Sequence, residues 1–173
     1  MNNKNKISIL LVIALLGTCL FFTPHLAVNS MKSAAESGDA NKLASYVDFP
    51  ALKENLKISI GAKISDVAKD QQDNPFAYIG AALAMAIVNP LIDALVTPSS
   101  LSMMMKGEKP SLEGKQVGYS KSQSDADVSM SYDGINRFIV TINKKTENEK
   151  PLRLIYNRDG IFFWRLTAID IPF

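Results

Sequence analysis

The most constraining feature of the sequence is an apolar run near its start, Ile7 to Phe22. As a helix, its sixteen residues would measure about 24 Å, near the lower limit for crossing the roughly 30 Å hydrocarbon core of a bilayer. Eleven of these residues are Leu, Ile, Val or Phe, the side chains that favour insertion into a membrane. We therefore interpret residues 1–22 as a signal-anchor or transmembrane segment.

The positions of the basic residues predict the orientation of this segment. Lys4 and Lys6 precede the run, and the next basic residue along the chain is Lys32. Because positive charge beside a membrane segment stays in the cytoplasm, the residues that follow should lie on the far side. We expect a single-pass protein of the inner (cytoplasmic) membrane, with its C-terminal domain in the periplasm.

Removal of the segment after export is a separate question. A cut after Ala27 would place His25 at a position where signal cleavage favours a small residue. The sequence "LGTC" is similar to a lipoprotein signal in which Cys19 would carry the lipid, although Thr18 is larger than the residue usual before that cysteine. We favour a retained anchor; the alternatives are secretion to the periplasm after cleavage and a lipoprotein through Cys19.

The rest of the chain, residues 23–173, has the size of one domain and no formal net charge. Two of the 19 Lys and Arg residues precede the apolar run, which leaves 17 basic residues against 17 acidic ones. A nucleic-acid-binding domain usually carries an excess of positive charge, so we expect no nucleic-acid partner. Cys19 is the only cysteine, which excludes an intramolecular disulfide and a cysteine metal cluster.

Helical signals fill residues 25–106. Gly38 should end a first helix and Asp39 should cap a short second one. Pro50 suits the first position of a third helix, and Thr97 should cap a further short one. The third helix has one apolar face, made of Leu52, Leu56, Ile60, Ile64 and Val67.

The apolar segment at residues 76–96 is harder to assign. Asp93 opposes insertion into a bilayer, and Asn89 and Pro90 interrupt the helix and add to that cost. We interpret the segment as a buried core helix; a second transmembrane helix and a wall of an apolar pocket are the alternatives. The methionines at 103–105 are interpreted as flexible apolar filler rather than a soft-metal site.

From about residue 115 the apolar period changes to two, which predicts strands over about 115–171. A turn is expected near Asp133 and Gly134, and "NRDG" at residues 157–160 should turn the chain into its closing strand, in which Trp164 faces one side. Helices followed by antiparallel strands predict an α+β domain, with several helices packed against a curved C-terminal sheet.

The carboxylate of Asp48 precedes the helix expected to begin at Pro50. Its charge would meet the positive end of the helix dipole and the unpaired N–H groups there, and Phe49 can fold back onto the helix as an apolar staple. We interpret this stretch as a helix corner. A role for Asp48 as an acid or base in a pocket is the alternative.

Three stretches of the chain resemble a known family. They are "AAESGDANKLASYVDFPALKENLK", "LVTP" and the closing "FWRLTAIDIP", and they resemble the bacterial domain-of-unknown-function family 2939, envelope proteins with an N-terminal apolar segment. The resemblance covers most of residues 23–173, and its most specific parts are Val47 to Pro50 and the closing stretch. The order of helices and strands is also similar, more weakly, to the NTF2-like cone folds. The family carries no assigned reaction, so the resemblance implies a class and a location only.

The residues favour a non-catalytic function. His25 is the only histidine and lies just beyond the membrane segment, and the chain has no glycine-rich phosphate loop and no paired-histidine metal motif. We therefore name no catalytic, cofactor-binding or metal-binding residue and expect no cofactor. Our main hypothesis is a membrane-tethered binding or scaffolding domain, held through Ile7 to Phe22, with an envelope protein as its partner.

Two other hypotheses stay open. The first is a carrier or sensor of an apolar ligand such as a lipid. It predicts a cavity of several hundred Å³ at the mouth of the sheet, lined by residues 76–96 and the methionines. The second is an NTF2-like enzyme that uses Asp48 or Asp93, with Tyr46 as a hydrogen-bond donor.

Overall fold

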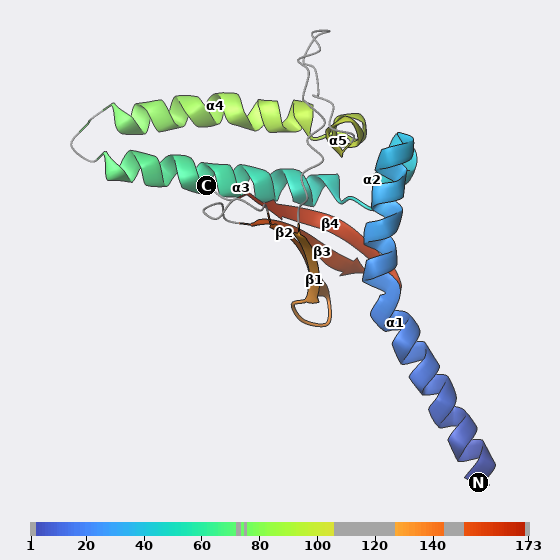
Figure 1. The fold of residues 1–173 in the computed structure, drawn as a ribbon. Helices are drawn as coiled ribbons and strands as arrows, with labels where there is room; N and C mark the ends of the chain where they lie inside the picture. The colour runs from blue at the N-terminus through green and yellow to red at the C-terminus, as the bar shows by residue number, and fades with distance from the viewer. Residues whose placement is uncertain (1–2, 72–73, 75, 106–126, 144–150, 172–173) are drawn as a thin grey trace.

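The computed structural model describes residues 3–71, 74, 76–105, 127–143 and 151–171 of the chain. Within these residues, helices come first and strands follow, and Figure 1 shows the first and third helices lying against the sheet. The predicted α+β class is therefore confirmed. The elements are α1 (Asn3–Ser37), α2 (Ala40–Ser45), α3 (Phe49–Asp70), α4 (Ala77–Leu95), α5 (Pro98–Met105), β1 (Asp127–Tyr132), β2 (Arg137–Asn143), β3 (Leu152–Asp159) and β4 (Phe163–Asp170).

Helix α1 runs from the apolar segment into the domain as one continuous helix. Its first half is largely exposed and projects away from the rest of the molecule (Figure 1). In its second half, Ala27, Met31 and Ala34 are buried in the core. The chain therefore passes the predicted boundary at Phe22 without any break in the helix.

Two linked hydrogen bonds support α1 at its internal proline. Pro24 has no N–H to donate to the carbonyl of Leu20, the partner that an unbroken helix would supply. The Thr23 hydroxyl donates to that carbonyl instead, at 2.7 Å. The Trp164 indole N–H, from β4, donates in turn to the Thr23 oxygen at 2.9 Å. The sheet therefore supports α1 at the point where the backbone hydrogen bonding of the helix is interrupted.

The sheet is a simple antiparallel meander with the strand order β1-β2-β3-β4. Its two described turns each contain a glycine with positive φ, Gly134 at +103° and Gly160 at +78°, a conformation that other residues rarely adopt. Both turns lie where the sequence predicts them. The predicted start of the strands near residue 115, and the loop at 144–150, lie outside the described residues. The inward side chains of the sheet are Phe138, Val140, Tyr156, Trp164 and Leu166, all of them buried.

The stretch Val47 to Pro50 covers the free edge of β4. Val47 forms a parallel bridge with Leu166; the Asp48 N–H donates to the Leu166 carbonyl at 2.9 Å, and the Leu166 N–H donates to the Tyr46 carbonyl at 2.8 Å. The Asp48 carboxylate accepts from the Ala51 N–H at 3.0 Å and caps α3. The helix-corner interpretation is therefore confirmed, with α3 beginning one residue before Pro50.

The cap makes a specific stability prediction. We expect Asp48→Ala to lower the free energy of unfolding by about 1 kcal/mol, because the N-terminal N–H groups of α3 lose their acceptor. Asp48→Asn should cost clearly less, since asparagine is an equally good cap. Thermal unfolding of the full chain in detergent micelles measures both. Equal losses for the two variants would contradict the assignment of Asp48 as a cap.

Candidate functional site

The paired helices α3 and α4 form an arm that extends beyond the sheet. The two helices lie side by side, and the half of the arm next to their connection has no strand beneath it (Figure 1). Only Ile92 of α4 is fully buried, and Val88 packs partly against the core. The prediction of a buried core helix at 76–96 is therefore wrong, because α4 has α3 along one side and much of its other surface is exposed.

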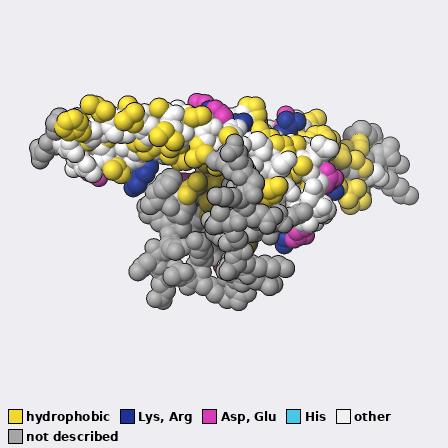
Figure 2. Space-filling view, turned by 90° about the horizontal axis from the view of Figure 1, so that it is seen from above, with side chains coloured by type: hydrophobic (Ala, Val, Ile, Leu, Met, Phe, Trp, Pro, Cys, Tyr) yellow, Lys and Arg dark blue, Asp and Glu magenta, His cyan; other side chains and the backbone are white. Residues whose placement is uncertain are grey.

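An apolar stripe runs along the exposed side of α4. Four residues at helical spacing are between 57% and 72% exposed: Phe76, Ile79, Leu83 and Ile87. We call them the α4 stripe. Figure 2 shows hydrophobic side chains gathered along the arm that contains this helix. By length and composition, α1 and α4 are each apolar enough to cross a membrane.

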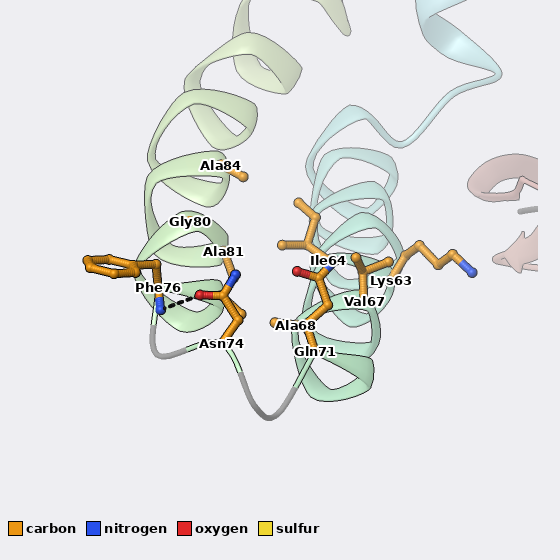
Figure 3. A pocket seen from close by; sticks show the side chains of 11 residues that line it. Lys63, Ile64, Val67, Ala68, Gln71, Asn74, Phe76, Gly80, Ala81 and Ala84 are labelled. Atoms are coloured by element: carbon orange, nitrogen blue, oxygen red, sulfur yellow. Dashed lines mark hydrogen bonds between the residues drawn. The ribbon is translucent and has the colours of Figure 1, made fainter.

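An open groove of about 420 Å³ lies between α3 and α4 near their connection. Figure 3 shows Ile64 pointing toward Ala81 and Ala84, with the Phe76 ring directed away from α3 at the rim. The volume fits the predicted size of an apolar cavity. The groove lies on the arm rather than at the mouth of the sheet, and Met103, whose side chain is the one described among the three methionines, does not line it. Its lining residues are Lys63, Ile64, Val67, Ala68, Gln71, Asn74, Phe76, Ala77, Gly80, Ala81 and Ala84.

Two lysines of α3 hold the opposite end of α4. Lys57 Nζ lies 2.8 Å from Asp93 Oδ2, and Lys53 Nζ donates to the Asp93 carbonyl oxygen at 3.0 Å. The hydrogen bond from Lys57 lowers the pKa of the Asp93 carboxyl. Asp93 therefore stays ionised at a pH low enough to protonate an unperturbed aspartate. Asp93 therefore links the two helices of the arm.

The predicted catalytic candidates have structural partners. Asp48 caps α3 and Asp93 links α3 to α4, while Tyr46 packs partly buried against the core and pairs through its carbonyl with β4. Within the described part of the chain, no group of three or more His, Cys, Asp or Glu side chains could hold a metal ion. Of the three methionines at 103–105, the described side chain is that of Met103, which is exposed.

Sequence reasoning missed an aromatic junction between α1 and the sheet. Phe21 stacks on Tyr132 with ring centroids 5.2 Å apart, and the Tyr132 hydroxyl donates to the Phe21 carbonyl at 2.7 Å. Partial burial raises the pKa of Tyr132, which keeps the hydroxyl a donor. The His25 ring lies 4.8 Å from Phe138, and the Arg158 guanidinium lies 4.5 Å from the Trp164 ring centroid. Aromatic residues at the end of an apolar run are a signal that could have pointed to this junction.

The link through Asp93 makes a pH prediction. Because its pKa is lowered on folding, the carboxylate stabilises the fold fully above its unfolded pKa and loses this contribution as the pH falls through its folded pKa. We expect Asp93→Asn to lower the unfolding midpoint slightly at neutral pH, since the pair is exposed, and to have no effect once wild-type Asp93 is protonated. Denaturant unfolding from about pH 7 to about pH 2 tests this, because the folded pKa of Asp93 lies below the ordinary aspartate range. A deficit that grows toward low pH would contradict it.

Comparison with known proteins places the chain in one family. No curated protein and no solved structure matches it, so the likeness to NTF2-like cones stays a prediction. A family model described as a protein of unknown function (DUF2939) matches residues 13–104. The matched region spans more than half of the chain, from within the apolar run of α1 into α5, and includes the Val47 to Pro50 corner. It ends before the strands, so the predicted likeness of the closing stretch to the family stays a prediction. The chain therefore belongs to the DUF2939 family.

Proposed function

We propose that this chain is a single-pass, membrane-tethered binding or scaffolding domain of the bacterial envelope, non-catalytic and facing the periplasm. The continuity of α1 carries the proposal. Its first half presents an exposed apolar surface of a length suited to a bilayer, and its second half is part of the domain core. An anchor joined in this way cannot separate from the domain without unfolding the second half of the helix.

The packing of α1 also supports retention of the anchor over cleavage. Thr23 accepts the Trp164 indole hydrogen bond, and Pro24 and Ala27 are buried. A cut after Ala27 would remove all three residues and expose the aromatic side chains beneath them. A lipoprotein through Cys19 would keep these contacts, so it remains the alternative mode of attachment.

Tethering and orientation can be tested together on the full chain. We expect the protein to resist extraction by alkaline carbonate, to keep an intact N-terminus by mass spectrometry, and to give an active alkaline phosphatase when that enzyme is fused to its C-terminus. Periplasmic phosphatase activity requires export, so a fusion that is inactive but well expressed would overturn the orientation. A mass that begins at Cys19 with an attached lipid would replace the helical anchor with the lipoprotein alternative.

The α4 stripe supports the binding role. Contiguous apolar surface of this kind on a folded domain commonly marks a site of interaction. The structural roles of Asp48 and Asp93 support the absence of catalysis, because each carboxylate already has a partner within the fold. We therefore propose that the arm formed by α3 and α4 is the binding element, and that it contacts an envelope protein through the stripe.

A second candidate function is the carriage or sensing of an apolar ligand such as a lipid. The groove between α3 and α4 favours it, since about 420 Å³ is in the range of small-molecule sites and most of its lining is apolar. Gly80 offers a way to fill the groove, because a Cβ at that position would meet nothing within 4 Å. Binding on the outer side of α4 and binding in the groove can therefore be separated by mutation.

Photo-crosslinking distinguishes the two candidates. We expect a photoreactive residue in place of Leu83, on the α4 stripe, to form protein adducts in living cells, whereas one in place of exposed Ser99 on α5 should not. For the ligand candidate, a photoreactive residue in place of Ile64 should capture lipid, and Gly80→Leu should abolish that capture. Equal adducts at Leu83 and Ser99 would contradict the binding role of the stripe.

A further inference from the structure

We infer that the β1–β2 and β3–β4 turns insert into the periplasmic boundary of the same bilayer that α1 crosses. The domain would then rest on the membrane surface rather than stand clear of it. This inference rests on the proposed tether and adds a second, independent contact between the protein and the lipid.

Hydrogen bonds place both turns at the level where α1 leaves the domain. Tyr132, the last residue of β1, donates to the Phe21 carbonyl. Trp164, at the start of β4, donates to the Thr23 hydroxyl. Figure 1 shows the β1–β2 turn on the side of the domain from which the projecting half of α1 departs. The turns therefore face the direction in which the anchor runs.

The length of the apolar helix places the membrane boundary at this level. The run Ile7 to Phe22 is about 24 Å long, short of a hydrocarbon core of about 30 Å. Extending the span to Leu26, which is exposed, makes twenty residues and about 30 Å. The boundary then falls beside Phe21 to Leu26, the part of α1 that contacts the sheet through Tyr132 and Trp164.

The two turns expose large apolar side chains at this boundary. Their four residues are between 56% and 83% exposed: Ile135 in the first turn, and Ile161, Phe162 and Phe163 in and beside the second. Water is a poor environment for such side chains, whereas the interface of a bilayer accepts isoleucine and phenylalanine readily. Phe21 and Phe22 of α1 are also exposed, and Phe21 stacks on Tyr132 at the end of β1, so exposed apolar side chains lie on the anchor and on the turns at the same level.

Arg158 ties the two turns into one unit. Its Nε and Nη2 donate to the Ile135 carbonyl at 3.3 and 3.2 Å, and its Nη1 donates to the Ile161 carbonyl at 2.7 Å. Carbonyl groups entering a bilayer interface without partners would be costly, and the guanidinium satisfies one in each turn. Both turns can therefore enter a less polar environment with these two carbonyl groups already hydrogen-bonded.

Two of the three arginines beside the turns are paired with carboxylates. Arg137 lies 3.3 Å from the Asp133 carboxylate, and Arg165 lies 2.9 Å from that of Asp159. Arg158 has no carboxylate partner among the described residues, but its guanidinium is turned inward, toward the carbonyls of the two turns and the Trp164 ring, rather than outward toward headgroups. We therefore assign the contact to the apolar interface of the bilayer, with little dependence on headgroup charge. The α4 stripe is not part of this contact, because α4 lies on the side of the domain away from the projecting half of α1 (Figure 1).

Single-cysteine labelling of the full chain tests this placement. In a Cys19→Ser background, Ile135→Cys and Ile161→Cys each receive an environment-sensitive fluorophore, and the protein is reconstituted in phosphatidylcholine nanodiscs. Ile87→Cys on the α4 stripe is the matched control, because Ile87 is 67% exposed and Ile161 is 65% exposed. All three positions lie on the surface, so the core is unchanged.

We expect labels at Ile135 and Ile161 to emit at shorter wavelength than the label at Ile87. They should also be several-fold less sensitive to aqueous iodide and more sensitive to a headgroup-linked quencher. Replacing part of the phosphatidylcholine with phosphatidylglycerol should leave these values unchanged. If all three labels report water while the protein stays in the discs, the inference is overturned and the tether stands. Equal shielding at all three positions would also overturn the assignment to the turns, and a protein that does not enter the discs would overturn both proposals.

Discussion

The contact on which the structure most depends is the Thr23 hydroxyl, placed between the Leu20 carbonyl and the Trp164 indole. A proline inside a helix removes one backbone hydrogen bond, and an unsupported helix commonly kinks or ends there. Here the missing bond is replaced by a side chain, which is itself held by the last strand of the sheet. This arrangement allows one helix to expose an apolar surface along its first half and to pack in the domain core along its second half. The aromatic junction and the position of the turns follow from that continuity, and the proposal that the anchor is retained rests on it.

The second constraint is the free edge of β4. An edge strand with unpaired backbone groups invites aggregation, and the chain covers this one with the corner between α2 and α3. A register shift opposite Ile155 and Tyr156 accompanies the pairing, and Asn55 of α3 donates to the Thr167 carbonyl at 3.2 Å nearby. The corner at Val47 to Pro50 lies within the region matched by the DUF2939 model, whereas the strand that it contacts lies beyond that region. The matched part of the chain therefore includes the element that joins the helices to the sheet.

Local signals in the sequence predicted most of the elements. Proline and aspartate at helix starts, the four-residue spacing in α3 and the two-residue alternation in β2 and β4 each depend on neighbours along the chain, so a single sequence contains them. The burial of α4 was wrongly predicted because periodicity shows which side of a helix is apolar and says nothing about what covers it. The groove lies on the arm, away from the mouth of the sheet where the ligand hypothesis expects its cavity, because its position depends on how far two helices extend past a sheet. The junction at Phe21 and Tyr132 joins residues more than a hundred positions apart, so the phenylalanines at the end of the apolar run could mark one side of it but could not identify the partner.

The unbroken α1 has a mechanical consequence. Flexible linkers let a tethered domain sample many orientations above a membrane, whereas a helix shared by anchor and core transmits every change of its tilt to the whole globule. Membrane segments tilt to match the thickness of the hydrocarbon layer. If α1 crosses a bilayer as proposed, a thicker or thinner bilayer would therefore change both the height and the direction of the arm formed by α3 and α4. Lipid composition would in this way set the direction from which another molecule can approach.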